Sequence, residues 1–230
     1  MNSPRFLALV CAAVVLAGCD SAAPEGAATA PDSETGVGSY ARGVVMGRQS
    51  QTAVLDNEAF IEGVRAGIAG DDPKYTDDEM QAGLLAMGEL EMAAKNAETE
   101  ANITAGQAFL ASNRERSGIM ETASGLQYEV IAEGDGDKPI DTNVVRVHYR
   151  GTTLAGETFD ASYDRGEPAE FPLNRVIAGW TEGLQLMSVG ANYKFYIPQD
   201  LAYGVNSPPG APFGPGETLI FEVELLEIVS

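Results

Sequence analysis

Cysteine and histidine are scarce in this sequence of 230 residues, and this scarcity excludes several kinds of active site. The only cysteines are Cys11 and Cys19, and the only histidine is His148. If the N-terminal segment is a cleaved lipoprotein signal, Cys11 leaves with it and Cys19 carries lipid. The exported chain then has neither a disulfide nor a cysteine nucleophile. One histidine cannot build a multi-histidine metal site, so we expect no metal and no cofactor.

Basic residues are also few. Fourteen Lys and Arg stand against 34 Asp and Glu, which gives a formal net charge of −20. A surface this acidic repels phosphate backbones and anionic lipids. We therefore expect no nucleic-acid partner, and any membrane attachment has to come from lipid rather than from charge. Solubility or a saline habitat would explain the acidity without any specific site.

The N-terminal apolar run, residues 6–16, is shorter than the roughly 20 residues needed to span a bilayer. Arg5 precedes it and small residues follow, which predicts a cleaved signal peptide over residues 1–18. The stretch Leu16–Cys19 (LAGC) resembles the bacterial lipobox, whose cysteine becomes the lipidated first residue. An ordinary signal peptide with an incidental cysteine is the alternative. Residues 19–38 are small and polar, which predicts a flexible tether.

Residues 39–118 have a helical pattern and contain one proline, Pro73. The capping residues predict three helices: one from Ser39 to about Ser50, one between Asp56 and Gly70, and one over about residues 76–116 that opens with a capping box at Thr76–Glu79.

The third helix has an uneven apolar pattern. A stripe that includes Leu84 and Leu90 is expected to pack on the two short helices, whereas residues 94–102 read as a solvated rod. The resulting core is thin, and small units of this kind gain stability by pairing with a second copy. We therefore predict a dimerisation domain over residues 39–118; a monomeric three-helix cap is the alternative.

Residues 119–230 are rich in glycine, proline and alternating apolar residues. The alternation predicts strands over residues 125–131, 145–150, 193–197 and 219–225, with one short helix over 175–187. This pattern is typical of an α+β domain in which an antiparallel β-sheet wraps on a single helix.

Trp180, the only tryptophan, lies on this helix between Gly179 and Gly183. A core position is one interpretation. The other is the floor of a binding site, with the two glycines leaving the indole face open. Too many aromatic residues point inward for one helix to cover, which favours an open apolar hollow. The set comprises Tyr149, Phe159, Phe171, Trp180, Tyr203 and Phe221, with the carboxylate of Asp160 beside it.

The second half of the chain resembles the FKBP-type peptidyl-prolyl cis-trans isomerases over nearly all of residues 120–229. The resemblance rests on five ordered stretches: Val147–Gly151, Thr158–Ser162, Val176–Leu184, Asp200–Gly204 and Thr218–Leu226. The whole chain, with lipobox, tether and long helix, resembles the macrophage infectivity potentiator group of exported FKBP proteins.

The resemblance implies roles for the residues of the hollow. Trp180 would form the floor of a proline pocket, the Ile177 N–H and the Tyr203 hydroxyl would bind the peptide carbonyl, and Asp160 would line the side where the amide rotates. The implied catalytic set is Tyr149, Phe159, Asp160, Trp180, Tyr203 and Phe221, and the implied substrate-binding set is Phe171, Val176, Ile177 and Phe213.

Four residues depart from this pattern or leave alternatives. Ala169 stands where the family often has an aromatic residue, and Phe213 stands where an aliphatic residue is usual, which bears on substrate preference. Asp160 is alternatively a surface carboxylate satisfied by Arg165 or by a backbone N–H. His148 is expected to be structural, because strand parity points it away from Tyr149.

The implied function is isomerisation of X-Pro bonds in exported proteins, together with a chaperone role for the paired helices. The implied partners are proline-containing unfolded proteins, and macrolides of the FK506 type are expected inhibitors. The alternative is a binding module or holdase that binds proline-containing segments without catalysing their isomerisation. Asp20 after the lipidated cysteine favours inner-membrane retention in some bacteria, whereas relatives of this architecture often lie on the outer membrane.

Overall fold

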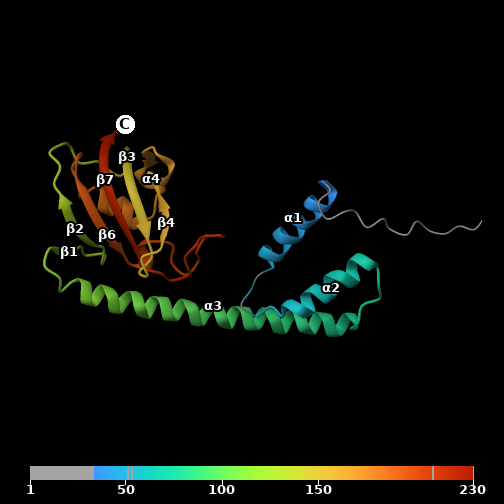
Figure 1. Ribbon diagram of the computed structural model, residues 1–230. Helices are drawn as coiled ribbons and strands as arrows, with labels where there is room; N and C mark the ends of the chain where they lie inside the picture. Colours follow the sequence, from blue (N-terminus) through green and yellow to red (C-terminus); the bar gives the residue numbers. More distant parts are fainter. Residues whose placement is uncertain (1–33, 51, 53, 209, 230) are drawn as a thin grey trace, which may run out of the picture. The chain divides into compact units, whose positions relative to one another are not determined.

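The computed structural model describes residues 34–50, 52, 54–208 and 210–229 (Figure 1). The chain divides into two compact units, residues 1–51 and 52–230. The predicted signal peptide, the predicted lipidation site at Cys19 and most of the predicted tether lie outside the described residues. Within the described ranges, no helix is both long and apolar enough to cross a membrane.

The first unit contains helix α1 (Glu34–Gln49). The prediction that Ser39 caps this helix is wrong, because Ser39 lies inside it and its Oγ donates a hydrogen bond to the carbonyl of Thr35 at 2.8 Å. Residues 34–38, assigned to the tether from their composition, are helical. The acidic Glu34 in the first turn favours a helix start there, because it complements the positive end of the helix dipole.

In the second unit, helices α2 (Asn57–Ala69) and α3 (Asp77–Asn113) have the predicted caps. Asp56 accepts hydrogen bonds from the N–H groups of Glu58 and Ala59, each at 3.0 Å. Gly70 ends α2 in the left-handed conformation that glycine adopts without strain. The capping box between Thr76 and Glu79 is present at the start of α3.

The apolar stripe of α3 is exposed in this chain. Leu84 is 69 % and Leu90 is 58 % exposed, and α2 contains no buried residue. The expectation that the stripe is packed is therefore wrong for Leu84 and Leu90 in the second unit, whereas Met87 of the same stripe is half-buried. The residues of α3 that are buried, Gly106, Leu110 and Asn113, all lie near its C-terminal end.

The C-terminal part of the second unit is an antiparallel sheet, which confirms the α+β class. Its strands are β1 (Ile119–Glu121), β2 (Gln127–Ala132), β3 (Val144–Thr152), β4 (Thr158–Ala161), β5 (Ala169–Pro172), β6 (Asn192–Ile197) and β7 (Leu219–Ile228). Their order is β1-β2-β6-β7-β3-β4, and β5 also pairs with β3 (Figure 1). The long strand β3 thus pairs with β5 near its start and with β4 near its end.

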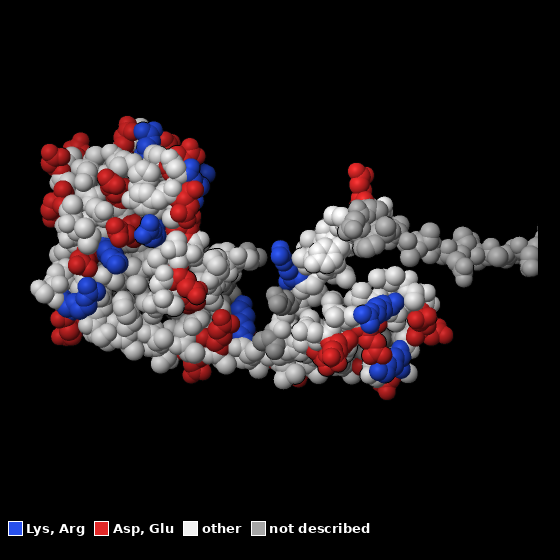
Figure 2. All heavy atoms as spheres, in the orientation of Figure 1, with Lys and Arg blue, Asp and Glu red and all other residues white. Residues whose placement is uncertain are grey.

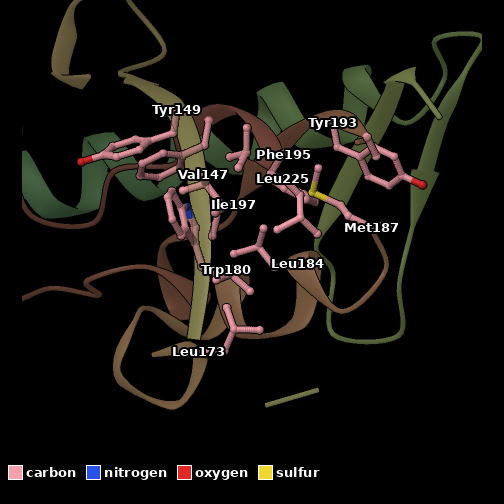
Figure 3. Close-up of a cluster of buried hydrophobic side chains, with 14 of the residues drawn as sticks. Val147, Tyr149, Leu173, Trp180, Leu184, Met187, Tyr193, Phe195, Ile197 and Leu225 are labelled. Carbon is pink, nitrogen blue, oxygen red and sulfur yellow. The ribbon is translucent and has the colours of Figure 1, made fainter. Parts of the chain in front are cut away.

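One short helix, α5 (Ala178–Leu184), covers the inner face of the sheet. It is shorter than predicted, because a 3₁₀ turn (Leu173–Arg175) comes first and Val176 and Ile177 are extended. Trp180, Leu184 and the inward residues of β3, β6 and β7 form one hydrophobic core. Figure 3 shows Trp180 and Tyr149 at one end of this core and Met187 and Tyr193 at the other.

The C-terminal end of α3 is joined to the sheet by buried side chains. Asn113 Nδ2 donates to Gln127 Oε1 at 2.9 Å, and Gln127 Nε2 donates to the carbonyl of Leu110 at 2.9 Å. Asn113 and Gln127 are each at most 1 % exposed. Breaking the bond between Asn113 and Gln127 would leave buried polar atoms unpaired, at a cost of roughly 1–3 kcal/mol. This end of the helix is therefore firmly attached to β2.

The outer face of the sheet carries charged side chains, as the strand alternation predicts. Arg146 forms an ion pair with Glu170 at 2.6 Å and a second one with Glu227. Figure 2 shows Asp and Glu side chains spread over the visible face, with Lys and Arg side chains among them. On that face the acidic charge is dispersed rather than gathered into one patch.

Candidate active site

A cavity of about 460 Å³ opens between α5 and the sheet. Strands β3, β4, β5 and β7 contribute to its wall, as do the segment before α5 and the loop after β6. Nine of the ten residues predicted for the site line it. The lining residues are Tyr149, Phe159, Asp160, Phe171, Arg175, Val176, Ile177, Trp180, Tyr203 and Phe221.

Three aromatic rings stand upright around Trp180. The ring planes of Tyr149, Phe171 and Phe221 meet the indole plane at 86°, 87° and 82°, with centroids 5.2, 5.4 and 5.3 Å away. Edge-to-face contacts of this kind are favourable, and each contributes about 0.5–1.5 kcal/mol beyond burial. The result is a rigid aromatic box with the indole as its floor.

Both interpretations of Trp180 hold at once. The residue is only 4 % exposed and belongs to the hydrophobic core, yet it also lines the cavity. Its Nε1 is buried and has no hydrogen-bond partner within the described part of the chain. The indole N–H is therefore a buried donor without an acceptor in this part of the chain, which costs the folded state roughly 1–3 kcal/mol.

The prediction that Gly179 and Gly183 leave the indole face open is wrong. A Cβ at Gly179 would lie 2.5 Å from Ile197 Cγ2, and one at Gly183 would lie 2.6 Å from Phe195 Cε1. Both glycines therefore face β6 rather than the open side of the indole. They let α5 approach the sheet closely, because a side chain at either position would separate helix and strand.

Asp160 forms a hydrogen-bonded triangle with Tyr149 and Arg165. The Tyr149 hydroxyl donates to Asp160 Oδ2, and Arg165 donates to Asp160 Oδ1 at 2.8 Å and to the Tyr149 hydroxyl oxygen at 2.9 Å. Asp160 thus lies at the edge of the cavity, hydrogen-bonded to Tyr149, and is also paired with Arg165, as the alternative interpretation proposed. Burial raises the pKa of Tyr149, and its hydrogen bond to Asp160 raises it further. The hydroxyl therefore stays protonated at neutral pH.

Two hydrogen-bond donors at the cavity are free. The N–H of Ile177, the residue that precedes α5, has no acceptor among the described residues. The Tyr203 hydroxyl likewise has no partner there, and burial raises the pKa of this phenol. Both groups can therefore donate to a carbonyl oxygen of a molecule in the cavity.

One predicted residue takes another position. Phe213 does not line the cavity; its ring lies 4.9 Å from that of Phe159 and 5.3 Å from that of Tyr203. His148 does not line the cavity either, as its predicted structural role requires: it hydrogen-bonds Ser162 at 3.0 Å and stacks on Tyr163.

Sequence reasoning did not assign site roles to Arg165 and Arg175. Arg175 lines the cavity, and Arg165 holds both polar groups of its edge. The position of Arg165 shortly after Asp160 was a usable signal, because the one-turn helix α4 (Ser162–Arg165) brings the two opposite charges together. No feature of the sequence around Arg175 distinguishes it from a surface arginine.

Comparison with known proteins agrees with this architecture. Residues 136–226 match the family described as FKBP-type peptidyl-prolyl cis-trans isomerase, and residues 37–130 match the domain amino terminal to it. An FKBP-type peptidyl-prolyl cis-trans isomerase FkpA of Aeromonas hydrophila is 42 % identical over 90 % of this chain and 80 % of its own length. The outer membrane protein MIP of Legionella longbeachae is 38 % identical over 83 % of this chain and 84 % of its own length.

Among solved structures, the crystal structure of FkpA from Escherichia coli is similar with a TM-score of 0.64 and 33 % identity. The match covers 86 % of this chain and 97 % of that one. The chain belongs to the FKBP-type peptidyl-prolyl cis-trans isomerases.

Proposed function

We propose that this isomerase acts on X-Pro bonds of exported proteins in the cell envelope, as a homodimer, and that it twists the prolyl amide over the indole of Trp180. The observation that carries the proposal is the aromatic box with Trp180 as its floor and two unpartnered donors at its edge. Such a site accepts a pyrrolidine ring and a carbonyl without needing a reactive side chain.

Isomerisation of an X-Pro bond requires no reactive side chain, only modest stabilisation of the twisted amide. Rotation about an X-Pro bond crosses a barrier of ~18–20 kcal/mol, which makes the uncatalysed step slow. The twisted amide loses resonance and with it part of its charge separation, so an environment poor in water favours it over the planar form. A thousandfold acceleration requires about 4 kcal/mol of differential stabilisation. Desolvation in the box and one or two hydrogen bonds are of the right size to supply it.

Each residue has a role in this proposal. Trp180 supports the ring, and Tyr149, Phe171 and Phe221 exclude water from its sides. The Ile177 N–H and the Tyr203 hydroxyl hold carbonyl oxygens, while Val176 borders the rim. Phe159 and Asp160 face the rotating carbonyl, and Arg165 fixes Asp160 in place. Phe213 acts indirectly, by supporting Phe159 and Tyr203.

The dimer is proposed from exposed apolar surface. Ile68, Leu84, Leu85 and Leu90 are between 58 % and 83 % exposed, all on α2 and α3. Monomeric soluble proteins rarely expose such clusters. An isolated helix of the length of α2 is marginal in water unless an apolar face is covered. A second copy of the chain would cover these residues and supply the core that the single chain lacks.

The location is proposed from the N-terminal sequence and from one relative. The signal peptide and the lipid on Cys19 would tether the protein to a bacterial membrane, facing the periplasm. The Legionella relative is named an outer membrane protein. In this setting, unfolded proline-containing proteins are the natural partners, and the paired helices would hold them as a chaperone does. Macrolides of the FK506 type would compete for the aromatic box.

Exchange spectroscopy separates catalysis from mere binding. We expect the wild-type protein to shorten the cis–trans lifetime of a model X-Pro peptide in NMR exchange spectra, and Trp180→Leu to reduce this effect at least about tenfold. Phe195→Leu is the matched control, because it truncates an equally buried ring outside the cavity. Line broadening without a shortened lifetime would instead show a proline-binding module or holdase.

A further inference from the structure

One face of α3 lies against the loop that follows β6. Thr99, Asn102, Ile103 and Gly106 recur at helical spacing and share this face. The loop runs from Tyr203 to Thr218 and is called the rim loop below. The expectation that residues 94–102 form a solvated rod is wrong at this face, because Thr99 and Asn102 both contact the rim loop.

The contact is close and specific. Asn102 Nδ2 donates a hydrogen bond to the carbonyl of Pro215 at 3.0 Å. A Cβ added at Gly106 would overlap Thr218 Oγ1, and one added at Gly216 would lie 2.9 Å from Ile103 Cγ1. Glycines on both sides thus bring the helix and the base of the loop together, and no larger residue fits at Gly106 without a shift.

The rim loop is braced internally. The Gly216 N–H donates to the carbonyl of Gly204 at 2.9 Å, which joins the base of the loop to the neighbour of Tyr203. Ser207 Oγ donates to the carbonyl of Gly214, and the Gly214 N–H donates to Glu217 Oε1, each at 2.7 Å. A displacement at Pro215 or Gly216 is therefore transmitted to both ends of the loop.

The loop reaches the cavity through two rings. Phe213 precedes Gly214 and packs on Phe159, which lines the cavity, while Tyr203 lines the cavity itself. The Phe213 and Tyr203 rings also contact each other, 5.3 Å apart. The position of the free Tyr203 hydroxyl thus depends on how the loop is seated on α3.

We propose that Asn102 and Gly106 are positioning residues of the isomerase site, through which α3 holds the rim loop and thereby Tyr203 and Phe213. This inference rests on the proposed role of Tyr203 as a donor to the bound peptide. It makes the long helix part of the active-site scaffold rather than a spacer between two domains.

The structure allows the contact to be tested without detaching the helix. The C-terminal end of α3 is anchored separately by Asn113 and Gln127, so removal of the Asn102 side chain leaves that attachment in place. Asn96 offers a matched control on the same helix. Its side chain is exposed and makes no hydrogen bond to the described residues, and replacement by alanine gives the same change in helix propensity at either position.

The experiment uses the full chain labelled with 3-fluorotyrosine, with the Tyr203 resonance assigned through Tyr203→Phe. In Asn102→Ala we expect the ¹⁹F resonance of Tyr203 to shift or broaden, and kcat/KM for an X-Pro peptide to fall about threefold to tenfold, the equivalent of one hydrogen bond. In Asn96→Ala we expect both to match the wild type, and thermal unfolding is recorded for every variant.

Gly106→Ala provides an independent arm. The added methyl should displace the same loop, and Gly106→Ala combined with Thr218→Ala should restore the Tyr203 resonance toward that of Thr218→Ala alone, because the overlapping Oγ1 is gone. An unchanged Tyr203 resonance in Asn102→Ala and Gly106→Ala would overturn the inference. A shifted resonance with unchanged kcat/KM would overturn its catalytic part. The fluorine signal requires no turnover, so an inactive wild type would refute the proposed function alone.

Discussion

The Tyr149 hydroxyl donates a hydrogen bond to a carboxylate oxygen of Asp160, at the edge of an aromatic cavity. Arg165 binds both partners, so the carboxylate is held in one orientation. Asp160 can therefore act in two ways: directly on the rotating amide, or by fixing the ring of Tyr149 as a wall. The two roles predict different mutant behaviour.

We expect Asp160→Ala to lower kcat/KM by about tenfold or more, because a hydrogen bond to a charged group contributes about 1.5–3 kcal/mol. Tyr149→Phe keeps the ring and removes only the hydroxyl, so we expect a smaller loss. The measurement is kcat/KM for an X-Pro peptide in both single variants and in the double variant. Equal losses that do not add would show that Asp160 acts only through Tyr149.

The close packing of α5 on β6 predicts a stability effect at Gly179. Gly179→Ala places a methyl group 2.5 Å from Ile197 Cγ2, so we expect a loss of about 1–3 kcal/mol in the free energy of unfolding. Gly63→Ala on α2 is the control, because a Cβ there meets nothing within 4 Å and alanine favours a helix by up to about 1 kcal/mol. Denaturant unfolding measures both; equal stability of the two variants would contradict the packing argument.

The tyrosines of the cavity predict a pH dependence. Burial raises the pKa of Tyr149 and of Tyr203 above the ordinary value of 10.0. The folded state thus prefers the protonated phenols, so their stabilisation is complete below pH 10 and is lost as the pH rises through the raised values. We expect the unfolding midpoint to fall between pH 9 and about 11, and to fall less in Tyr149→Phe.

The same shifts predict a flat activity profile. Both hydroxyls remain protonated from about pH 6 to 9, and the proposed mechanism transfers no proton. kcat/KM for an X-Pro peptide should therefore be constant over this range. A bell-shaped profile would point to a general acid or base and would contradict the proposed mechanism.

The exposed stripe of α3 predicts how the dimer can be broken. We expect Leu84→Glu combined with Leu90→Glu to give a monomer at micromolar concentration, because two charges cannot be buried unpaired in an apolar interface. Gln81→Glu adds a charge at an exposed polar position of the same helix and should leave the dimer intact. Light scattering at several concentrations measures the mass, and a monomeric wild type would disprove the dimer.

Local signals in the sequence predicted several elements well. The caps at Asp56, Gly70 and Thr76 depend on residues next to them in the chain, and all three are present. The four long strands were visible because their inward side chains alternate. The short strands β4 and β5 were missed as strands, since each is four residues long and exists through pairing with β3.

Most of the residues that line the cavity could be predicted from the sequence, but the packing that forms the cavity could not. Inward parity and the family resemblance brought together Trp180 and its three upright rings. Three features depend on contacts between segments far apart in the chain. Gly179 faces β6, α5 begins only after Ile177, and Phe213 packs on Phe159 instead of lining the cavity. The packing of the rim loop on α3 also depends on contacts between distant segments, and the hydrophobic periodicity of the sequence does not predict it.

Trp180 is the only indole in the chain, and it forms the floor of the cavity. Its emission spectrum therefore originates from a single site, with no background from other tryptophans. A pyrrolidine that settles on this ring would displace solvent from it, so occupancy of the cavity should be readable by intrinsic fluorescence in the unmodified protein. The enzyme thus carries a built-in optical sensor for its own ligands.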